Sequence, residues 1–144
     1  MKGACKWAQQ YGPLIGRLLL ANLFIVAGFK KITATGFANT AGYMAATMPA
    51  LDPNLIKIML VLTIAIELGG GLMILVGWQA RWAAAIVFLW MIPVTWLFHA
   101  YWGLPPDQMQ AQFIQFQKNL AIMGALLLVV AQGSGAYSLG KDNC

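Results

Sequence analysis

The chain has 144 residues, of which 60% are hydrophobic and only 9% are charged, and its formal net charge is +5. Charged residues make up about 25% of an ordinary soluble domain, and a chain this short cannot bury so much apolar surface in a core of its own. The composition therefore excludes an ordinary soluble domain and predicts an all-α integral membrane protein.

Four apolar segments are long enough to cross a bilayer as helices, which takes about 20 residues each. Asp52 and Pro53 are typical of the N-cap and first turn of the second segment, and Pro93 should kink the third. We expect a single membrane domain over residues 1–144. Its spans are predicted over about residues 11–32, 53–77, 82–102 and 118–132.

Two shorter amphipathic segments lie between these spans. Apolar residues recur at helical spacing in both, beginning at Phe37 in the first and at Met109 in the second. Both patterns are typical of short helices that lie in the membrane interface or cap a bundle. The expected fold is a four-helix membrane bundle with two interfacial helices, over about residues 36–48 and 107–117.

The distribution of basic residues bears on the orientation of the bundle. An even number of spans places both termini on the same side of the membrane. Five Lys and Arg residues fall on that side and four on the other. Because cytoplasmic loops carry an excess of Lys and Arg, this count weakly favours an orientation with both termini in the cytoplasm.

One carboxylate, Glu67, lies near the middle of the second predicted span. A charged side chain at that depth costs about 2.5–3.5 kcal/mol unless it is neutralised, paired or hydrated. We expect a polar core in which Arg17 of the first span pairs with Glu67 and Asn22 lies nearby. This core either holds the two helices together or takes part in binding or proton handling, and the sequence leaves both hypotheses open.

Glycines cluster at two places in the predicted spans. Gly69, Gly70 and Gly71 follow the carboxylate directly, and Gly12 and Gly16 form a GxxxG pattern at the start of the first span. Small residues let helices in lipid approach closely, so we expect close helix packing at these positions. The alternative is that the glycines leave room for a flat ligand.

His99 is the only histidine and falls near the far end of the third predicted span. It lies at about the depth where Lys31, Lys118 and Asn119 enter the membrane. We expect these four residues to line a site for the head group of a quinone or a lipid. The simpler alternative is an interfacial histidine that is hydrogen-bonded to a neighbour. One histidine and two cysteines without CxxC spacing predict no metal site and no intrinsic cofactor.

Five segments together resemble the DoxX family of small bacterial membrane proteins, over about residues 13–138. They are GRLLLANLFIVAGFKKI, which contains Arg17, Gly28 and Lys31; GYMAATMP; AIELGGGLMILVGWQARWAA, which contains Glu67, Gly70, Gly77 and Arg81; TWLFH with His99; and FQKNLAIMGALLLV with Lys118 and Asn119. The resemblance implies a four-helix bundle with cytoplasmic termini, and Gly28 is a further expected position of close helix packing. It also implies a link to respiratory or redox metabolism, in which relatives are described as quinone-linked subunits or as partners of redox-defence enzymes.

We therefore expect a small inner-membrane subunit associated with quinone or redox metabolism, within a larger complex. It is not expected to be an enzyme alone, because without a metal or flavin motif a quinone or a partner must carry the electrons. The alternatives are a structural or assembly subunit that binds other membrane proteins, and an oligomeric transporter of protons or a small solute. The expected partners are the lipid bilayer and other membrane proteins, and no basic, aromatic-rich patch indicates nucleic acid.

Overall fold

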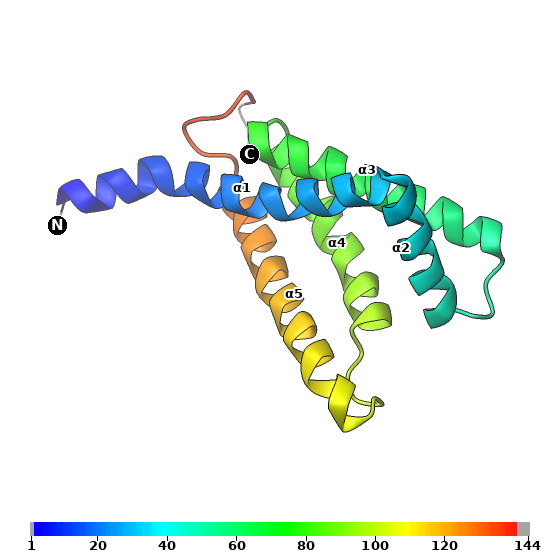
Figure 1. The fold of residues 1–144 in the computed structure, drawn as a ribbon. Coiled ribbons are helices and arrows are strands. Elements are labelled where there is room, and N and C mark those ends of the chain that lie inside the picture. The colour runs from blue at the N-terminus through cyan, green and yellow to red at the C-terminus, as the bar shows by residue number, and fades with distance from the viewer. Residues whose placement is uncertain (1, 141–144) are drawn as a thin grey trace.

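The structure, a computed structural model, describes residues 2–140, which are helical apart from short connections (Figure 1). Its helices are α1 (Lys2–Ile32), α2 (Ala34–Thr47), α3 (Pro53–Val76), α4 (Ala80–Phe98) and α5 (Pro106–Gln132). Within the described chain, four of them, all except α2, are long and apolar enough to cross a membrane. The expected all-α class with four spans is confirmed.

The helix boundaries differ from the predicted ones at three places. α1 begins at Lys2 and runs through Pro13, so it starts well before the predicted boundary near residue 11. α4 ends at Phe98 instead of near residue 102. The separate interfacial helix expected over residues 107–117 is instead the first part of α5, because no proline or glycine interrupts the chain between Pro106 and Gly124. The other short helix is a separate element, α2.

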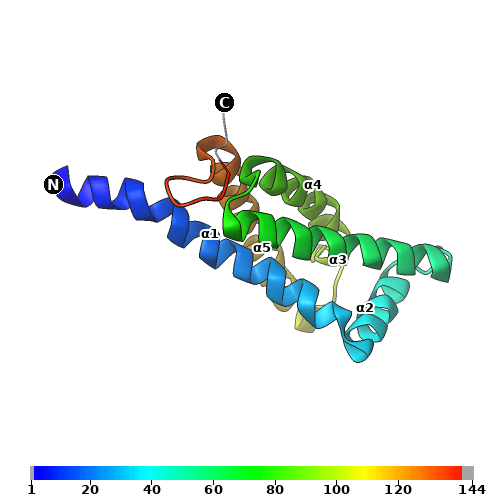
Figure 2. The same ribbon diagram turned by 90° about the horizontal axis from the view of Figure 1, so that it is seen from above.

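The helices are arranged as two packed pairs. α1 lies along α3 and α5 lies along α4, and contacts between α3 and α4 join the pairs (Figures 1 and 2). Ala21 of α1, Ile74 of α3, Val87 of α4 and Leu126 of α5 are fully buried in the shared core. A smaller cluster, which includes Met44 and Leu60, holds α2 against α3.

The C-terminal segment of the described chain returns to the first half of α1. Gln10 Nε2 donates a hydrogen bond of 2.9 Å to the Tyr137 hydroxyl, and the rings of Tyr11 and Tyr137 stack with their centroids 5.5 Å apart. Leu139 N donates to the Val76 carbonyl at 3.0 Å. These contacts place the N-terminal part of α1 and residues up to 140 at the same end of the bundle, as four spans require.

Two arginines bind the open carbonyl ends of helices. Arg17 is 1% exposed and donates to the carbonyls of Ile74 and Leu75, in the last turn of α3, at 3.3 and 3.4 Å. It also donates to the carbonyl of Tyr137. Arg81 binds the last turn of α5 in the same way. Because the last carbonyls of a helix have no partner within it and carry partial negative charge, both guanidinium groups stabilise helix C-termini.

The predicted close-packing glycines differ in their surroundings. A Cβ atom on Gly28 would lie 2.7 Å from Leu68 Cγ, and one on Gly71 would lie 3.0 Å from Ile25 Cγ1. Both glycines therefore lie where α1 and α3 touch. A Cβ on Gly70 would lie 2.5 Å from Val87 Cγ2 of α4, whereas one on Gly69 would meet nothing within 4 Å.

This contrast predicts opposite results for two neighbouring substitutions. We expect Gly70→Ala to lower the free energy of unfolding by about 1–3 kcal/mol, because overpacking a close contact forces backbone or rotamer shifts. Gly69→Ala should be neutral or raise stability by up to about 1 kcal/mol, because Ala has the higher helix propensity. Thermal unfolding of the two variants in the same detergent measures the difference, and equal melting temperatures would contradict the packing described.

Candidate functional site

A cavity of about 770 Å³ opens between the helices at the end where α1 meets α2. All five helices or their ends contribute to its lining, and its walls are mainly apolar, with Phe24, Trp90 and Leu97 among them. The four predicted head-group residues, Lys31, His99, Lys118 and Asn119, all line this cavity, and so does Glu67. The cavity therefore brings together ionisable and polar groups that lie far apart in the sequence.

The carboxylate of Glu67 pairs with Lys31. Lys31 Nζ lies 2.7 Å from Glu67 Oε2 and 2.9 Å from Oε1, and it also donates to the Ala27 carbonyl at 3.4 Å. The two side chains are 20% and 14% exposed. The cation at the end of α1 thus neutralises the carboxylate within the bundle, at a point that stays accessible from the cavity.

The predicted Arg17–Glu67 pair is wrong. Gly28 packs against the side chain of Leu68 and the Cβ atom of Glu67, which fixes the axial register of α1 on α3. Arg17 precedes Gly28 by 11 residues, about 16 Å along a helix, so it reaches the last turn of α3 instead. Lys31 lies less than one turn beyond Gly28 and takes the place that was expected for Arg17.

Asn22 does not belong to a polar core. It is exposed on the outer surface of α1, whereas Arg17, Ala21 and Phe24 are buried. At about 100° per residue, Asn22 is rotated by about 140° from Arg17 around the helix, so the two side chains leave α1 on nearly opposite faces. The polar core expected from these residues and Glu67 is therefore replaced by two separate arrangements, one around Arg17 at the middle of α1 and one around Lys31 at its C-terminal end.

His99 is held between α4 and α5. It is the C-cap residue of α4, and its backbone N–H donates to the Thr95 carbonyl at 3.1 Å. Its ring Nδ1 lies 2.9 Å from Gln112 Oε1. The cap fixes the start of the side chain and the amide fixes the plane of the ring, so the imidazole has a defined orientation in the cavity.

The last two predicted head-group residues come from α5. Asn119 is 8% exposed, and its Nδ2 donates to Thr95 Oγ1 at 3.1 Å. Lys118 Nζ donates to Gln115 Oε1 within the same helix, and its side chain is largely exposed. Asn119 therefore ties α5 to α4 inside the cavity, while Lys118 adds a cation at its rim.

Sequence reasoning missed the neutral partners of these groups. Thr95, Gln112 and Gln115 line or support the cavity, and Tyr43 of α2 closes one wall by donating to the Phe98 carbonyl at 3.0 Å. A helical wheel of α5 would have placed Gln112, Gln115 and Asn119 on one face, since they follow at intervals of three and four residues. No group of three His, Cys, Asp or Glu residues that could hold a metal ion occurs within residues 2–140.

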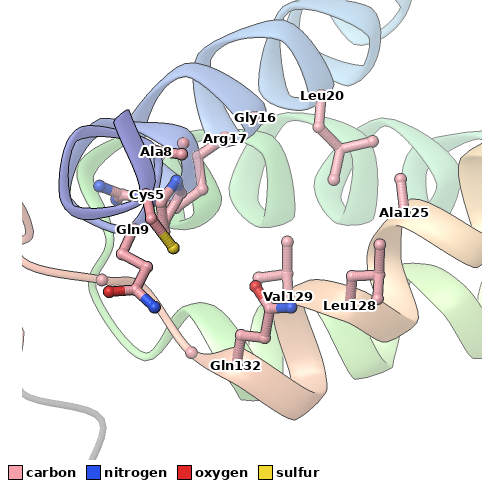
Figure 3. Close-up of a pocket in the computed structure, with 14 residues that line it drawn as sticks. Cys5, Ala8, Gln9, Gly16, Arg17, Leu20, Ala125, Leu128, Val129 and Gln132 are labelled. Atoms are coloured by element: carbon pink, nitrogen blue, oxygen red, sulfur yellow. The ribbon is translucent and has the colours of Figure 1, made fainter. Parts of the chain in front are cut away.

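A second cavity of about 670 Å³ lies between the first half of α1 and the second half of α5 (Figure 3). Gly12 and Gly16 line it, and a Cβ on either would meet nothing within 4 Å, so the expected close contact at the GxxxG pattern is absent from the described chain. Its polar lining comes mainly from Gln9, Arg17 and Gln132, and Arg17 is already engaged with backbone carbonyls. The first cavity is therefore the stronger candidate for a binding site.

Comparisons with known proteins find similar chains that are described as inner membrane proteins. The family model described as DoxX matches residues 12–100, a range that contains Lys31, Glu67 and His99. Inner membrane protein YqjF of Escherichia coli strain K12 is 36% identical over 137 residues, which cover 94% of this chain and 95% of the relative. Inner membrane protein YphA of the same strain is 31% identical over 131 residues, which cover 89% and 87%. No solved structure matches the chain.

Proposed function

The chain belongs to the DoxX family of small multi-pass inner-membrane proteins, and from that premise we propose that its larger cavity binds the head group of a quinone. The observation that carries the proposal is the convergence of Lys31, Glu67, His99 and Asn119 in one cavity with apolar walls. In this proposal the protein is a quinone-linked subunit of a larger redox complex, with both termini in the cytoplasm.

The size and chemistry of the cavity support this ligand class. A volume of about 770 Å³ falls within the range of about 300–1,000 Å³ that is typical of small-molecule sites, which combine apolar walls with a few placed polar groups. A quinone head group is flat and apolar on its faces and polar at two opposite oxygens. Trp90 and Leu97 offer the apolar wall, while Lys31 and Lys118 offer donors for the oxygens.

The proposal also accounts for the ion pair. A carboxylate between helices is costly in a membrane, and a pair that served only to hold helices together would be expected to be closed off by packing. Lys31 and Glu67 instead line the cavity, where they can exchange hydrogen bonds with a bound ligand. The redox chemistry itself would belong to the bound quinone and to a partner subunit that supplies or accepts electrons.

Transport of protons or a small solute is the second candidate, and the same ion pair favours it because Glu67 is reachable from the cavity. Proton flux in proteoliposomes that is lost in Glu67→Gln, without any quinone requirement, would support transport. An assembly role without chemistry would be supported by a stable protein partner in the absence of a small ligand.

The test is purification of the full chain in a gentle detergent, followed by mass spectrometry of the copurified quinones, lipids and proteins. We expect bound quinone at roughly one molecule per chain, well above its proportion in the copurified lipid. Quinone present only at the proportion found in bulk membrane lipid would contradict the proposal.

A further inference from the structure

The orientation of one side-chain amide determines which hydrogen bonds His99 can form. The ring Nδ1 of His99 contacts Gln112 Oε1 at 2.9 Å, and an amide oxygen can only accept a hydrogen bond. The proton of the neutral imidazole is therefore on Nδ1, where it is donated to Gln112. In this tautomer the other ring nitrogen, Nε2, has an open lone pair and acts as an acceptor.

Nε2 is available to a ligand. Within residues 2–140 no hydrogen bond engages it, and it is not among the buried polar atoms that lack a partner. His99 lines the larger cavity, so the acceptor is accessible in the space where the head group would lie. The Gln112 amide thus fixes the tautomer of His99, so that Nδ1 is a donor and Nε2 is an acceptor.

Three other polar groups of the cavity already have hydrogen-bond partners within the protein. Glu67 accepts two hydrogen bonds from Lys31, and the Tyr43 hydroxyl donates to a backbone carbonyl. Asn119 donates to Thr95. His99 Nε2 accepts no hydrogen bond from the described residues 2–140, so it can accept one from a ligand that brings a hydroxyl or N–H group.

Quinones and hydroquinones differ in this respect. The two oxygens of a quinone are carbonyls that only accept, whereas each oxygen of a hydroquinone carries a proton that it can donate. Resting on the proposed function, we infer that the cavity prefers the hydroquinone form, with a ring hydroxyl donating to His99 Nε2 and Gln112 acting as a positioning residue. The opposite amide orientation would make Nε2 a donor and would favour the quinone instead.

The preference is measured as the ratio of two dissociation constants. Purified full-length protein is titrated with decylubiquinone and, anaerobically, with decylubiquinol, and bound ligand is counted by mass spectrometry after equilibrium dialysis. We expect the wild type to bind the hydroquinone about tenfold more tightly, because the hydrogen bond to Nε2 is gained while an unsatisfied acceptor is avoided. His99→Phe should reduce the ratio to about one.

Two variants of α5 distinguish the positioning role of Gln112 from a general structural effect. Gln112→Leu removes the acceptor that fixes the tautomer of His99 and should reduce the preference several-fold. Gln117→Leu is the matched control, since Gln117 is exposed on the same helix and does not line the cavity, and its ratio should equal that of the wild type.

The outcomes distinguish this inference from the proposed function. Equal binding of both forms by the wild type, or a preference for the quinone, would overturn the inference and leave quinone binding intact. An unchanged preference in Gln112→Leu would also overturn it. The absence of saturable binding for either form would overturn both.

Discussion

Replacing Lys31 with Met is expected to lower the free energy of unfolding by about 3 kcal/mol, because it leaves Glu67 without its cation inside the bundle. Glu67→Gln should lower the free energy of unfolding by only about 1 kcal/mol, because the unpaired Lys31 lies at the C-terminal end of α1, where the helix carbonyls favour a cation. Its long side chain can also reach towards the membrane surface.

The double variant makes this prediction specific. Lys31→Met combined with Glu67→Gln removes both charges, so its stability should return to within about 1 kcal/mol of the wild type. The free energies of unfolding of the wild type, the two single variants and the double variant form a double-mutant cycle. They are measured by circular dichroism during titration with dodecyl sulfate in mixed micelles. Lys30→Met is the matched control, because Lys30 is exposed and lies outside the cavity, and it should unfold like the wild type. A double variant no more stable than Lys31→Met alone would refute the pairing.

The span layout could be predicted from the sequence because the length and apolarity of a helix that crosses a bilayer are fixed by the membrane itself. The partner of Glu67 could not be predicted from the sequence. Arg17 and Lys31 are both long cations on α1, and the choice between them depends on the axial offset of α1 against α3. That offset is set by close contacts such as Gly28 against Leu68 and Gly71 against Ile25, which hydrophobic periodicity does not reveal.

The error at α5 has a different cause. An amphipathic period is the same for a helix that lies in the interface and for the end of a span that continues beyond the apolar core. With no breaker after Pro106, the chain continues as one helix. This continuity matters for the site, because it places Gln112 and Asn119 on one rigid element facing His99 and Thr95.

Depth along the predicted spans is the only property that groups the candidate head-group residues in the sequence, and the structure places all four in one cavity. Their neutral partners were missed because threonine and glutamine carry no charge that would mark them within a span. The residues that orient the site are thus less visible in the sequence than the residues that they orient.

Filling the cavity should have the largest effect on ligand binding. Ala27 lines the cavity on α1, and a phenylalanine at this position would occupy the space beside Lys31 that the head group requires. We expect Ala27→Phe to weaken quinone binding by at least about 100-fold, which corresponds to about 2.7 kcal/mol. Val26 is the neighbouring residue, it is 43% exposed on the outer surface, and it does not line the cavity, so Val26→Phe should bind like the wild type.

The most direct measurement of the central claim is therefore the amount of decylubiquinone and decylubiquinol bound at saturation by the wild type, Ala27→Phe and Val26→Phe in the same detergent. Size-exclusion chromatography verifies that each variant is folded, and Ala27→Leu provides a smaller obstruction with an intermediate expected affinity. The account predicts one site per chain that is retained in Val26→Phe and lost in Ala27→Phe. Equal binding by folded Ala27→Phe and Val26→Phe would show that the ligand lies elsewhere and would contradict the account.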